Sequence, residues 1–554
     1  MAEDEREQEK EVPGVQEIIE KKFGLDDLPF FRTPDYMYKL NYWLGATTAA
    51  AFFFAVLTGL PLLLYYDPSN AYAQTQFVIH NVPYGSVILF SHLYASYAMI
   101  VLLYVHGVRN FFSGAYKKPR EFVWVLGVLL FAVTLGASFF GYSMVGDVLG
   151  VDAIGVGSGL ISLGIPGGDT IESWLFGAGS GTSLFSRLLG WHIIFVALLG
   201  LLFGIHLFLA ETYGMLPSRK EKPYAPAYYK KSEWMKFNAW WPRNFIYMMS
   251  IILTTWGVIM IVPNTLAALN QLMAVKLPLL INPAPAPAPN TAAAASVPAY
   301  PPWFFLFFYK VVDFLLPNGQ PLAQGDDILI LVVGIVLLLL VPFLDRSKYL
   351  SLLQRKFWTW IGIVFVSAII ELTVWGYLDP GVPAPFTQIV EVFGPTALVA
   401  ALVVAPLKPR GTSPMRGMTS QLSSLYMMVL ILLTAGTFFD FVKSPSLVGL
   451  GILIPLIAGL ILNSWSMLPD RRMPPTKALE TSVRRSPSSS LSFKKKLATY
   501  ATIIMAVASV AILVLVWNLP TTGPLSNVAG ALIGVVLVLW GQSVGMYHFV
   551  AYAK

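Results

Sequence analysis

Twelve apolar stretches, each long enough to form a membrane-spanning helix, constrain this chain more than any other feature of its sequence. A helix needs about 20 residues to cross the ~30 Å hydrocarbon core of a bilayer. Unpaired backbone groups are costly in lipid, so such stretches must be helical or close into a barrel. The composition agrees, with 56% hydrophobic and 12% charged residues. The sequence therefore predicts an all-α, polytopic transmembrane helix bundle of about 12 helices, with spans near 42–64, 86–108, 122–142, 188–210, 244–263, 327–344, 357–377, 388–407, 422–442, 446–467, 497–518 and 526–547.

The basic residues orient these spans. If the N-terminus is cytoplasmic, 33 of the 37 lysines and arginines fall on the cytoplasmic side, and only Arg187, Lys276, Lys310 and Lys443 fall outside. Cytoplasmic loops are rich in lysine and arginine. We therefore expect both termini in the cytoplasm. The net charge of +7 reflects this bias, and we expect no nucleic-acid partner.

Three segments are not predicted to span. Residues 10–30 could form a helix on the membrane surface or a solvated tail. The Pro/Ala-rich residues 282–302 predict an extended outer loop, and the basic, serine-rich residues 470–496 predict a cytoplasmic linker. We therefore divide the chain into a cytoplasmic segment (1–35), a first membrane domain (36–215), a second membrane domain (216–410) and an extension of four spans (411–554).

Four of the six histidines form two pairs with one spacing. His92 and His106 lie in the second predicted span, and His192 and His206 lie in the fourth. Fourteen residues of helix fall about 40° short of four turns and advance ~21 Å, so both members of a pair share one face. The two spans run in the same direction. His92 is therefore expected at the depth of His192, and His106 at the depth of His206.

Two imidazoles that face each other across a helix gap suit the axial positions of a haem iron. The chain has no cysteine, which excludes thiolate ligation, covalent haem attachment and an Fe–S cluster held by this chain. Single intramembrane histidines often only form hydrogen bonds between helices. The equal spacing and matched depth favour a dihaem four-helix core, whereas His80 and His548 have no such partner.

Four glycines repeat the histidine spacing. Gly45 and Gly59 are fourteen residues apart in the first span, and Gly127 and Gly141 are fourteen apart in the third. Glycine allows a flat ring to approach a helix closely, although glycines in membrane helices also serve helix packing alone. We expect one glycine from each helix at the depth of each haem.

Over residues 36–405 the chain resembles the cytochrome b subunit of cytochrome bc and related quinol-oxidising complexes. The resemblance lies in the histidine pairs, the glycine quartet and the segments LTG (58–60), HGVRNFFSGAY (106–116), FFGY (139–142), SRLLGWH (186–192), HLFLAET (206–212) and PPWFFLFFY (301–309). It implies that His92 and His192 hold an outer, low-potential haem, and that His106 and His206 hold an inner, high-potential haem.

The resemblance also implies cofactors and partners. Two haems are expected, of b-type or of a modified a-type, because axial imidazoles do not distinguish ring substituents. Arg109 and Arg187 stand where they would pair with haem propionates, or where each would extend to the membrane surface. Quinone from the membrane pool, a Rieske Fe–S protein, and a c-type cytochrome or terminal oxidase are the implied partners in a dimeric complex.

The outer quinol site departs from the family pattern. The family carries Pro-Glu-Trp-Tyr, where this chain has Pro301, Pro302, Trp303 and Phe304, so the proton-accepting glutamate is missing. Trp303 and Phe304 still offer apolar walls, and Tyr309 stands where the family has a tyrosine. Asp313 is a candidate acceptor if the segment is helical, because it lies four residues after that tyrosine, and otherwise a solvated loop residue. The expected quinol-site residues are Pro301, Trp303, Phe304, Tyr309, Asp313 and Tyr142.

The inner quinone site departs as well. Ala210 stands before Glu211 where the family has a histidine, and Lys236 with Asn238 stand where a Lys-Asp pair is expected. A complete Q cycle is therefore a hypothesis.

Two other classes stay open at this point. One is a dihaem membrane anchor that reduces quinone for a dehydrogenase. The other is a secondary transporter, for which twelve spans is a common number but for which we find no internal repeat.

Overall fold

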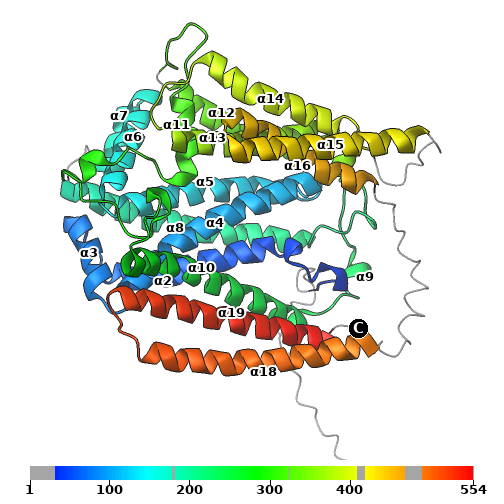
Figure 1. The fold of residues 1–554 in the computed structure, drawn as a ribbon, viewed down its shortest axis with the longest axis horizontal. Coiled ribbons are helices and arrows are strands. Elements are labelled where there is room, and N and C mark those ends of the chain that lie inside the picture. The colour runs from blue at the N-terminus through cyan, green and yellow to red at the C-terminus, as the bar shows by residue number, and fades with distance from the viewer. Residues whose placement is uncertain (1–31, 178–180, 324, 409–417, 468–488, 553–554) are drawn as a thin grey trace, which may run out of the picture.

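The computed structural model describes residues 32–177, 181–323, 325–408, 418–467 and 489–552, and it contains helices but no β-strands in these ranges (Figure 1). Twelve helices are long and apolar enough to cross a membrane. They confirm the all-α polytopic bundle. These helices are α2 (Leu44–Leu63), α4 (Gly85–Ser113), α5 (Glu121–Ser143), α8 (Gly181–Tyr213), α10 (Phe245–Met273), α12 (Asp326–Leu344), α13 (Lys356–Leu378), α14 (Phe386–Val404), α15 (Met418–Lys443), α16 (Leu447–Met467), α18 (Ser489–Trp517) and α19 (Pro524–Tyr552).

The two ends of the bundle differ. One end carries the loop 282–302 and the short helices α3 (Ala71–Asn81), α6 (Val148–Gly164), α7 (Gly168–Phe176) and α11 (Leu306–Val312) (Figure 1). We call it the Pro-rich end. The opposite end holds α9 (Lys231–Trp234) and the loops 114–120, 214–244 and 345–355, and we call it the basic end.

The four-helix core consists of two closely packed pairs. α4 packs mainly against α2, and α8 packs mainly against α5, while α4 and α8 have few direct backbone contacts. A cluster of apolar side chains fills the middle of this core, halfway between the two histidine depths. Its buried members are Ala51, Phe52, Phe54, Ala95, Met99, Leu130, Leu199 and Ile259.

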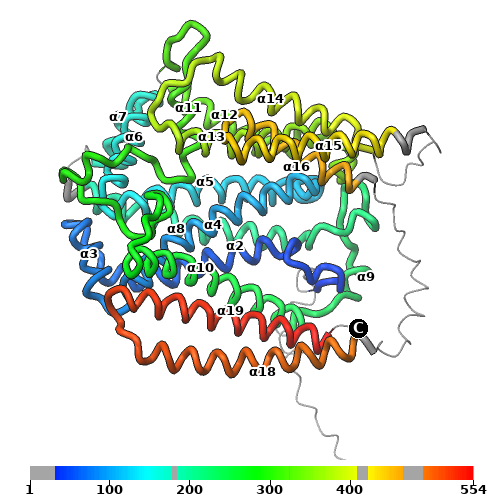
Figure 2. The backbone as a smooth tube through the Cα atoms, in the orientation of Figure 1, coloured from blue at the N-terminus to red at the C-terminus, as the bar shows by residue number. Residues whose placement is uncertain are grey.

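The four additional spans form two hairpins on opposite flanks. α16 packs against α13 and α14 and carries α15 beside it, whereas α19 packs against α10 and carries α18 on its other side (Figure 2). The predicted tail 10–30 and most of the predicted linker lie outside the described residues. The predicted linker, 470–496, extends too far toward the C-terminus, because α18 already begins at Ser489. Three consecutive lysines in its first turns made this helix start look like a loop.

A buried carboxyl group marks the contact of α16 with the main bundle. The Glu371 side chain in α13 is fully buried, and its Oε1 accepts a hydrogen bond of 2.7 Å from Thr396 Oγ1 in α14. Gly451 in α16 lies directly against this pair, and a Cβ there would be 1.9 Å from Glu371 Oε1. The absence of a side chain at Gly451 is therefore what allows α16 to dock.

α19 packs on α10 through glycines. A Cβ on Gly534 would lie 2.7 Å from the carbonyl oxygen of Gly257, and one on Gly257 would lie 2.5 Å from that of Gly534. We expect Gly534→Leu to destabilise the α10–α19 contact by about 1–3 kcal/mol, because the added side chain must push the backbones apart. Gly436→Leu is the control, since a Cβ at Gly436 would meet nothing within 4 Å. The check is the thermal unfolding midpoint in detergent, and equal midpoints for the two variants would contradict this packing argument.

Candidate functional site

The four intramembrane histidines lie at two depths of the core. His106 in α4 and His206 in α8 each lie seven residues before the end of their helix at the basic end. His92 and His192 lie toward the Pro-rich end. Their rings face each other across the gap between α4 and α8, with centroids 6.3 Å apart and planes at 75°.

Each histidine of the pair at the Pro-rich end rests against a glycine of the neighbouring helix. A Cβ on Gly59 would lie 3.0 Å from Cε1 of His92, and one on Gly141 would lie 2.8 Å from Cε1 of His192. Real Cβ atoms essentially never approach to 2.8 Å. A larger residue at Gly141 would therefore displace the imidazole.

The pair at the basic end shows the same arrangement with more room. A Cβ on Gly45 would lie 3.3 Å from Cε1 of His106, and one on Gly127 would lie 3.5 Å from Cε1 of His206. All four predicted glycines thus lie beside the predicted histidines, and both helix pairs, α2 with α4 and α5 with α8, make such a contact at each depth. The contacts are with Cε1 at the edge of each imidazole, so these glycines leave room for the rings beside α2 and α5.

In the pair at the Pro-rich end, backbone carbonyls determine which nitrogen of each imidazole is free. Nδ1 of His92 lies 2.9 Å from the carbonyl oxygen of Ala55, and Nδ1 of His192 lies 2.9 Å from that of Ala137. A carbonyl only accepts, so Nδ1 carries the proton and Nε2 keeps its lone pair. Ala55 and Ala137 each stand four residues before a glycine of the quartet. Sequence reasoning missed these partners because every residue has a carbonyl.

The surroundings of His106 are more polar. Asn110 Nδ2 donates a hydrogen bond of 3.0 Å to His106 Nε2, and Arg109 Nη1 donates one of 2.9 Å to Asn110 Oδ1. The Arg109 guanidinium also lies over the Tyr42 ring, 5.3 Å from its centroid. A metal at Nε2 would take the place of the Asn110 contact. Arg187 lies in α8, five residues before His192, and donates a hydrogen bond of 2.7 Å to the Trp174 carbonyl at the end of α7.

These residues fit the haems that the sequence predicts. Each pair offers two imidazoles from separate helices, and glycines make room beside every ring. In the pair at the Pro-rich end both Nδ1 atoms are held by backbone carbonyls, an arrangement that orients metal-binding histidines in other proteins. The apolar cluster between the two depths keeps the sites apart. No group of three or more His, Cys, Asp or Glu side chains that could form another metal site occurs in the described ranges.

Two of the predicted quinol-site residues, Trp303 and Phe304, form an aromatic wall with Tyr97 at the Pro-rich end. Trp303 and Phe304 follow Pro302 in a 3₁₀ turn that leads into α11, and Phe304 is 2% exposed. The Tyr97 ring of α4 contacts both of them, with centroid distances of 5.7 Å and 6.3 Å. Tyr142 lies in the last turn of α5. Tyr97 was not predicted, since a tyrosine in an apolar span carries no distinctive signal.

Asp313 is neither a fully solvated loop residue nor a free carboxylate. Its Oδ2 lies 3.2 Å from the buried Nζ of Lys310, which also donates to the carbonyls of Asp379 and Val382. Burial raises the pKa of Asp313 above its ordinary value, although the charge and hydrogen bond of Lys310 offset part of this shift. The carboxylate is therefore engaged in an ion pair at the end of α11.

Asp152 is an acidic residue near this wall that sequence reasoning missed. It lies in α6, and burial raises the pKa of its carboxyl group. Burial also raises the pKa of Tyr309 in α11, and the negative charges of Asp313 and Asp152 raise it further. Asp152 is in no ion pair among the described residues. Its position beyond the third span, outside any motif, gave no signal in the sequence.

The residues considered for an inner quinone site lie at the basic end. Glu211 is 6% exposed, and neither of its carboxyl oxygens has a hydrogen-bond partner in the described part of the chain. The Asn238 amide donates to the Thr33 carbonyl at 2.7 Å and to Asp35 Oδ1 at 3.0 Å. Asn238 thus joins the segment before α2 to the segment before α10.

Comparison with known proteins places the chain in a family. The family models described as "Cytochrome b(N-terminal)/b6/petB" and "Cytochrome b(C-terminal)/b6/petD" match residues 97–289 and 291–397. The cytochrome b of Sulfolobus acidocaldarius is 47% identical over 99% of both chains. The cytochrome b subunit of the Chlorobaculum thiosulfatiphilum cytochrome bc complex is 28% identical over 58% of this chain and 70% of that protein. A structure titled "Hyperthermophilic respiratory Complex III" shares the fold, with a TM-score of 0.54 and 22% identity over 70% of this chain and 94% of the other. By full-length similarity and by both of its domains, this chain belongs to the cytochrome b family.

Proposed function

We propose that this chain is a dihaem subunit that oxidises quinol at the Pro-rich end and moves electrons across the membrane. The observation that carries the proposal is the pair of matched histidine sites, each with a glycine beside every imidazole. His92 and His192 would hold one haem iron, and His106 and His206 the other. When bound, the haems would supply one-electron transfer between the two depths. Membership of the cytochrome b family leaves the transporter interpretation without support.

The chain's own residues would orient and insulate these groups. The hydrogen bonds from Nδ1 to Ala55 and Ala137 hold the imidazoles of His92 and His192 with Nε2 turned away from the backbone. Thr58 Oγ1 lies 3.2 Å from Nδ1 of His92 and supports the same orientation. The apolar cluster excludes water between the two depths, so that charge in the sites is poorly screened.

Quinol would bind against the aromatic wall and lose two electrons and two protons. Trp303, Phe304 and Tyr97 supply apolar surface for the ring. One electron would go to the outer haem, and the other to a Rieske Fe–S protein. Asp152 would accept a proton in place of the missing motif glutamate, because Asp313 is already paired with Lys310.

The partners follow from chemistry and from the relatives. The chain has no cysteine, so the Rieske cluster must belong to another subunit. A similar protein from Geobacillus thermodenitrificans, 32% identical over 31% of this chain, is named menaquinol:cytochrome c reductase cytochrome b subunit. We extend this to a dimeric complex that contains a Rieske protein and a c-type cytochrome or terminal oxidase. The complex would lie in the plasma membrane of a prokaryote, with both termini of this chain in the cytoplasm.

Spectroscopy of the purified complex tests the central proposal. A reduced-minus-oxidised spectrum should show haem bands that quinol reduces, and pyridine haemochrome analysis should identify the haem type and give about two haems per chain. Co-purification of a Rieske protein separates this function from that of a dehydrogenase anchor. A preparation without haem would refute the proposal.

The role of Asp152 predicts a pH effect. Only the ionised carboxylate accepts a proton, and burial raises its pKa, so quinol oxidation should fall as the pH drops through this raised pKa. Asp152→Asn should slow the reaction about 100-fold and remove this acidic limb of the pH profile. The exposed Asp169 at the same end offers a matched control, Asp169→Asn. An unchanged profile in Asp152→Asn would assign proton acceptance to another group.

A further inference from the structure

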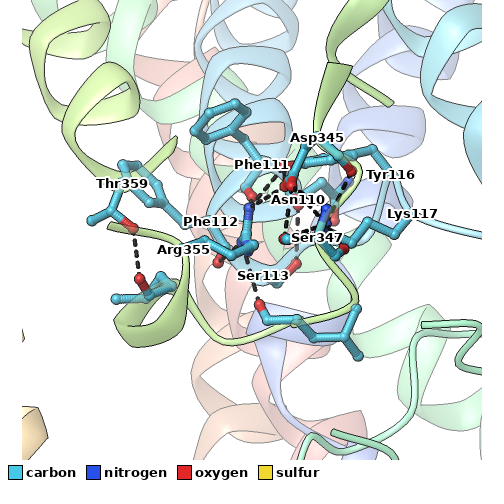
Figure 3. Close-up of polar contacts among 12 residues, drawn as sticks. Asn110, Phe111, Phe112, Ser113, Tyr116, Lys117, Asp345, Ser347, Arg355 and Thr359 are labelled. Atoms are coloured by element: carbon cyan, nitrogen blue, oxygen red, sulfur yellow. Dashed lines mark hydrogen bonds and ion pairs between the residues drawn. The ribbon is translucent and has the colours of Figure 1, made fainter. Parts of the chain in front are cut away.

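Two loops at the basic end are joined by a buried ionic network (Figure 3). Lys117 belongs to the loop between α4 and α5, whereas Asp345 and Arg355 belong to the segment between α12 and α13. Asp345 Oδ1 lies 2.9 Å from Lys117 Nζ, and its Oδ2 lies 3.3 Å from Arg355 Nη1. All three side chains are at most 3% exposed. The charges of this network are therefore almost completely removed from water.

Hydrogen bonds within the network oppose the effect of burial, which lowers the pKa of Lys117. Asp345 Oδ2 accepts a hydrogen bond of 2.6 Å from the Tyr116 hydroxyl, and Ser347 Oγ donates one of 2.7 Å to Oδ1. Burial alone would raise the pKa of Asp345, but these hydrogen bonds and the Lys117 contacts lower it below its ordinary value. Lys117 Nζ also donates to the carbonyls of Asp345 and Ser347, and Arg355 Nη2 to three carbonyls, those of Phe111, Phe112 and Leu350.

The network carries an excess of one positive charge, because two cations share one carboxylate. The acidic groups nearby on this end do not balance it. Glu211, in the last turn of α8, makes no hydrogen bond to the network or to any other group in the described residues. Asp35, Glu121, Glu221 and Glu233 are at least partly exposed to solvent, where their charges are screened.

The excess charge lies next to the inner histidine site. Arg355 binds the carbonyls of Phe111 and Phe112, five and six residues after His106 on α4, which is about 8–9 Å along the helix axis. Asn110 contacts His106 directly. The outer histidine of the same helix, His92, lies ~21 Å further along the axis. A charge at the network should therefore act much more strongly on the inner site than on the outer one.

We propose that the Lys117–Asp345–Arg355 network raises the reduction potential of the inner haem through its uncompensated positive charge. This inference rests on the proposed function, since it requires a haem at His106 and His206. Reduction adds an electron to the site, so a nearby fixed cation stabilises the reduced form, and burial keeps that interaction from being screened. The network thereby favours electron transfer from the outer to the inner depth.

Redox titration of the purified complex, with the two haems resolved, tests this charge effect. Lys117→Gln reduces the net charge of the network from +1 to 0 and should lower the inner midpoint potential. Asp345→Asn increases it to +2 and should raise that potential. The double variant restores +1 and should return close to the wild-type value. Lys118→Gln removes the same charge from the neighbouring exposed residue and should leave both potentials unchanged.

The pattern of outcomes separates charge from structural damage. A general loosening of the loops would move the inner potential in the same direction in both single variants and further in the double variant. That result, or equal shifts at both haems, would overturn the proposal, as would unchanged potentials in both single variants. Should a single variant fail to assemble, the other one, measured with Lys118→Gln, still gives the sign of the effect. Absence of haem from the wild-type complex would instead refute the proposed function.

Discussion

Replacing His106 with leucine should leave the complex with about one haem per chain instead of two. Leucine is close to histidine in size but offers no lone pair, so the inner iron would lose one axial ligand. His206 alone, facing an apolar side chain, should not retain the haem. The measurement is the haem-to-protein ratio by pyridine haemochrome analysis, combined with redox titration, in which the inner haem should vanish and the outer one persist.

His80→Leu is the matched control for this experiment. His80 is exposed near the end of α3 and belongs to neither pair, so the haem content should stay unchanged. The corresponding substitution at His192 should remove the outer haem in the same way. Retention of two haems in both the His106 and the His192 variants would show that these imidazoles do not hold the irons.

Gly141→Val should also abolish one haem site, without touching any ligand. A Cβ at this position would already lie 2.8 Å from Cε1 of His192, and valine adds two further methyl groups at the same place. The ring would have to leave its hydrogen bond with the Ala137 carbonyl, so its Nε2 would no longer face the gap between α4 and α8. We expect the outer haem to be lost or to titrate at a changed potential.

Substitutions at two other glycines serve as controls for this prediction. Gly204→Val introduces the same side chain into α8, where a Cβ would meet nothing within 4 Å, and it should preserve both haems. Gly127→Ala should have a mild effect, because its Cβ would stand 3.5 Å from His206, an ordinary contact distance. If Gly141→Val and Gly204→Val bound haem equally well, the glycine would be serving helix packing alone.

Much of the architecture could be predicted from local patterns. The length and apolarity of the spans dictate twelve helices, because a chain in lipid must satisfy its backbone internally. The fourteen-residue spacing places one histidine from each of α4 and α8, and one glycine from each of α2 and α5, at each depth, since helix geometry is regular over that distance. The start of α18 was misjudged, because serines and lysines in its first two turns resemble a linker when their tertiary contacts are unknown.

Contacts between distant segments required the tertiary structure. No sequence pattern indicated that the four additional spans separate into two hairpins on opposite flanks, or that Gly451 lies against Glu371. The pairing of Lys117 with Asp345 joins residues 228 positions apart, and the carbonyls that orient His92 and His192 belong to unremarkable alanines. Periodicity along one helix records which face is apolar, whereas the partner of that face depends on how all the helices pack together.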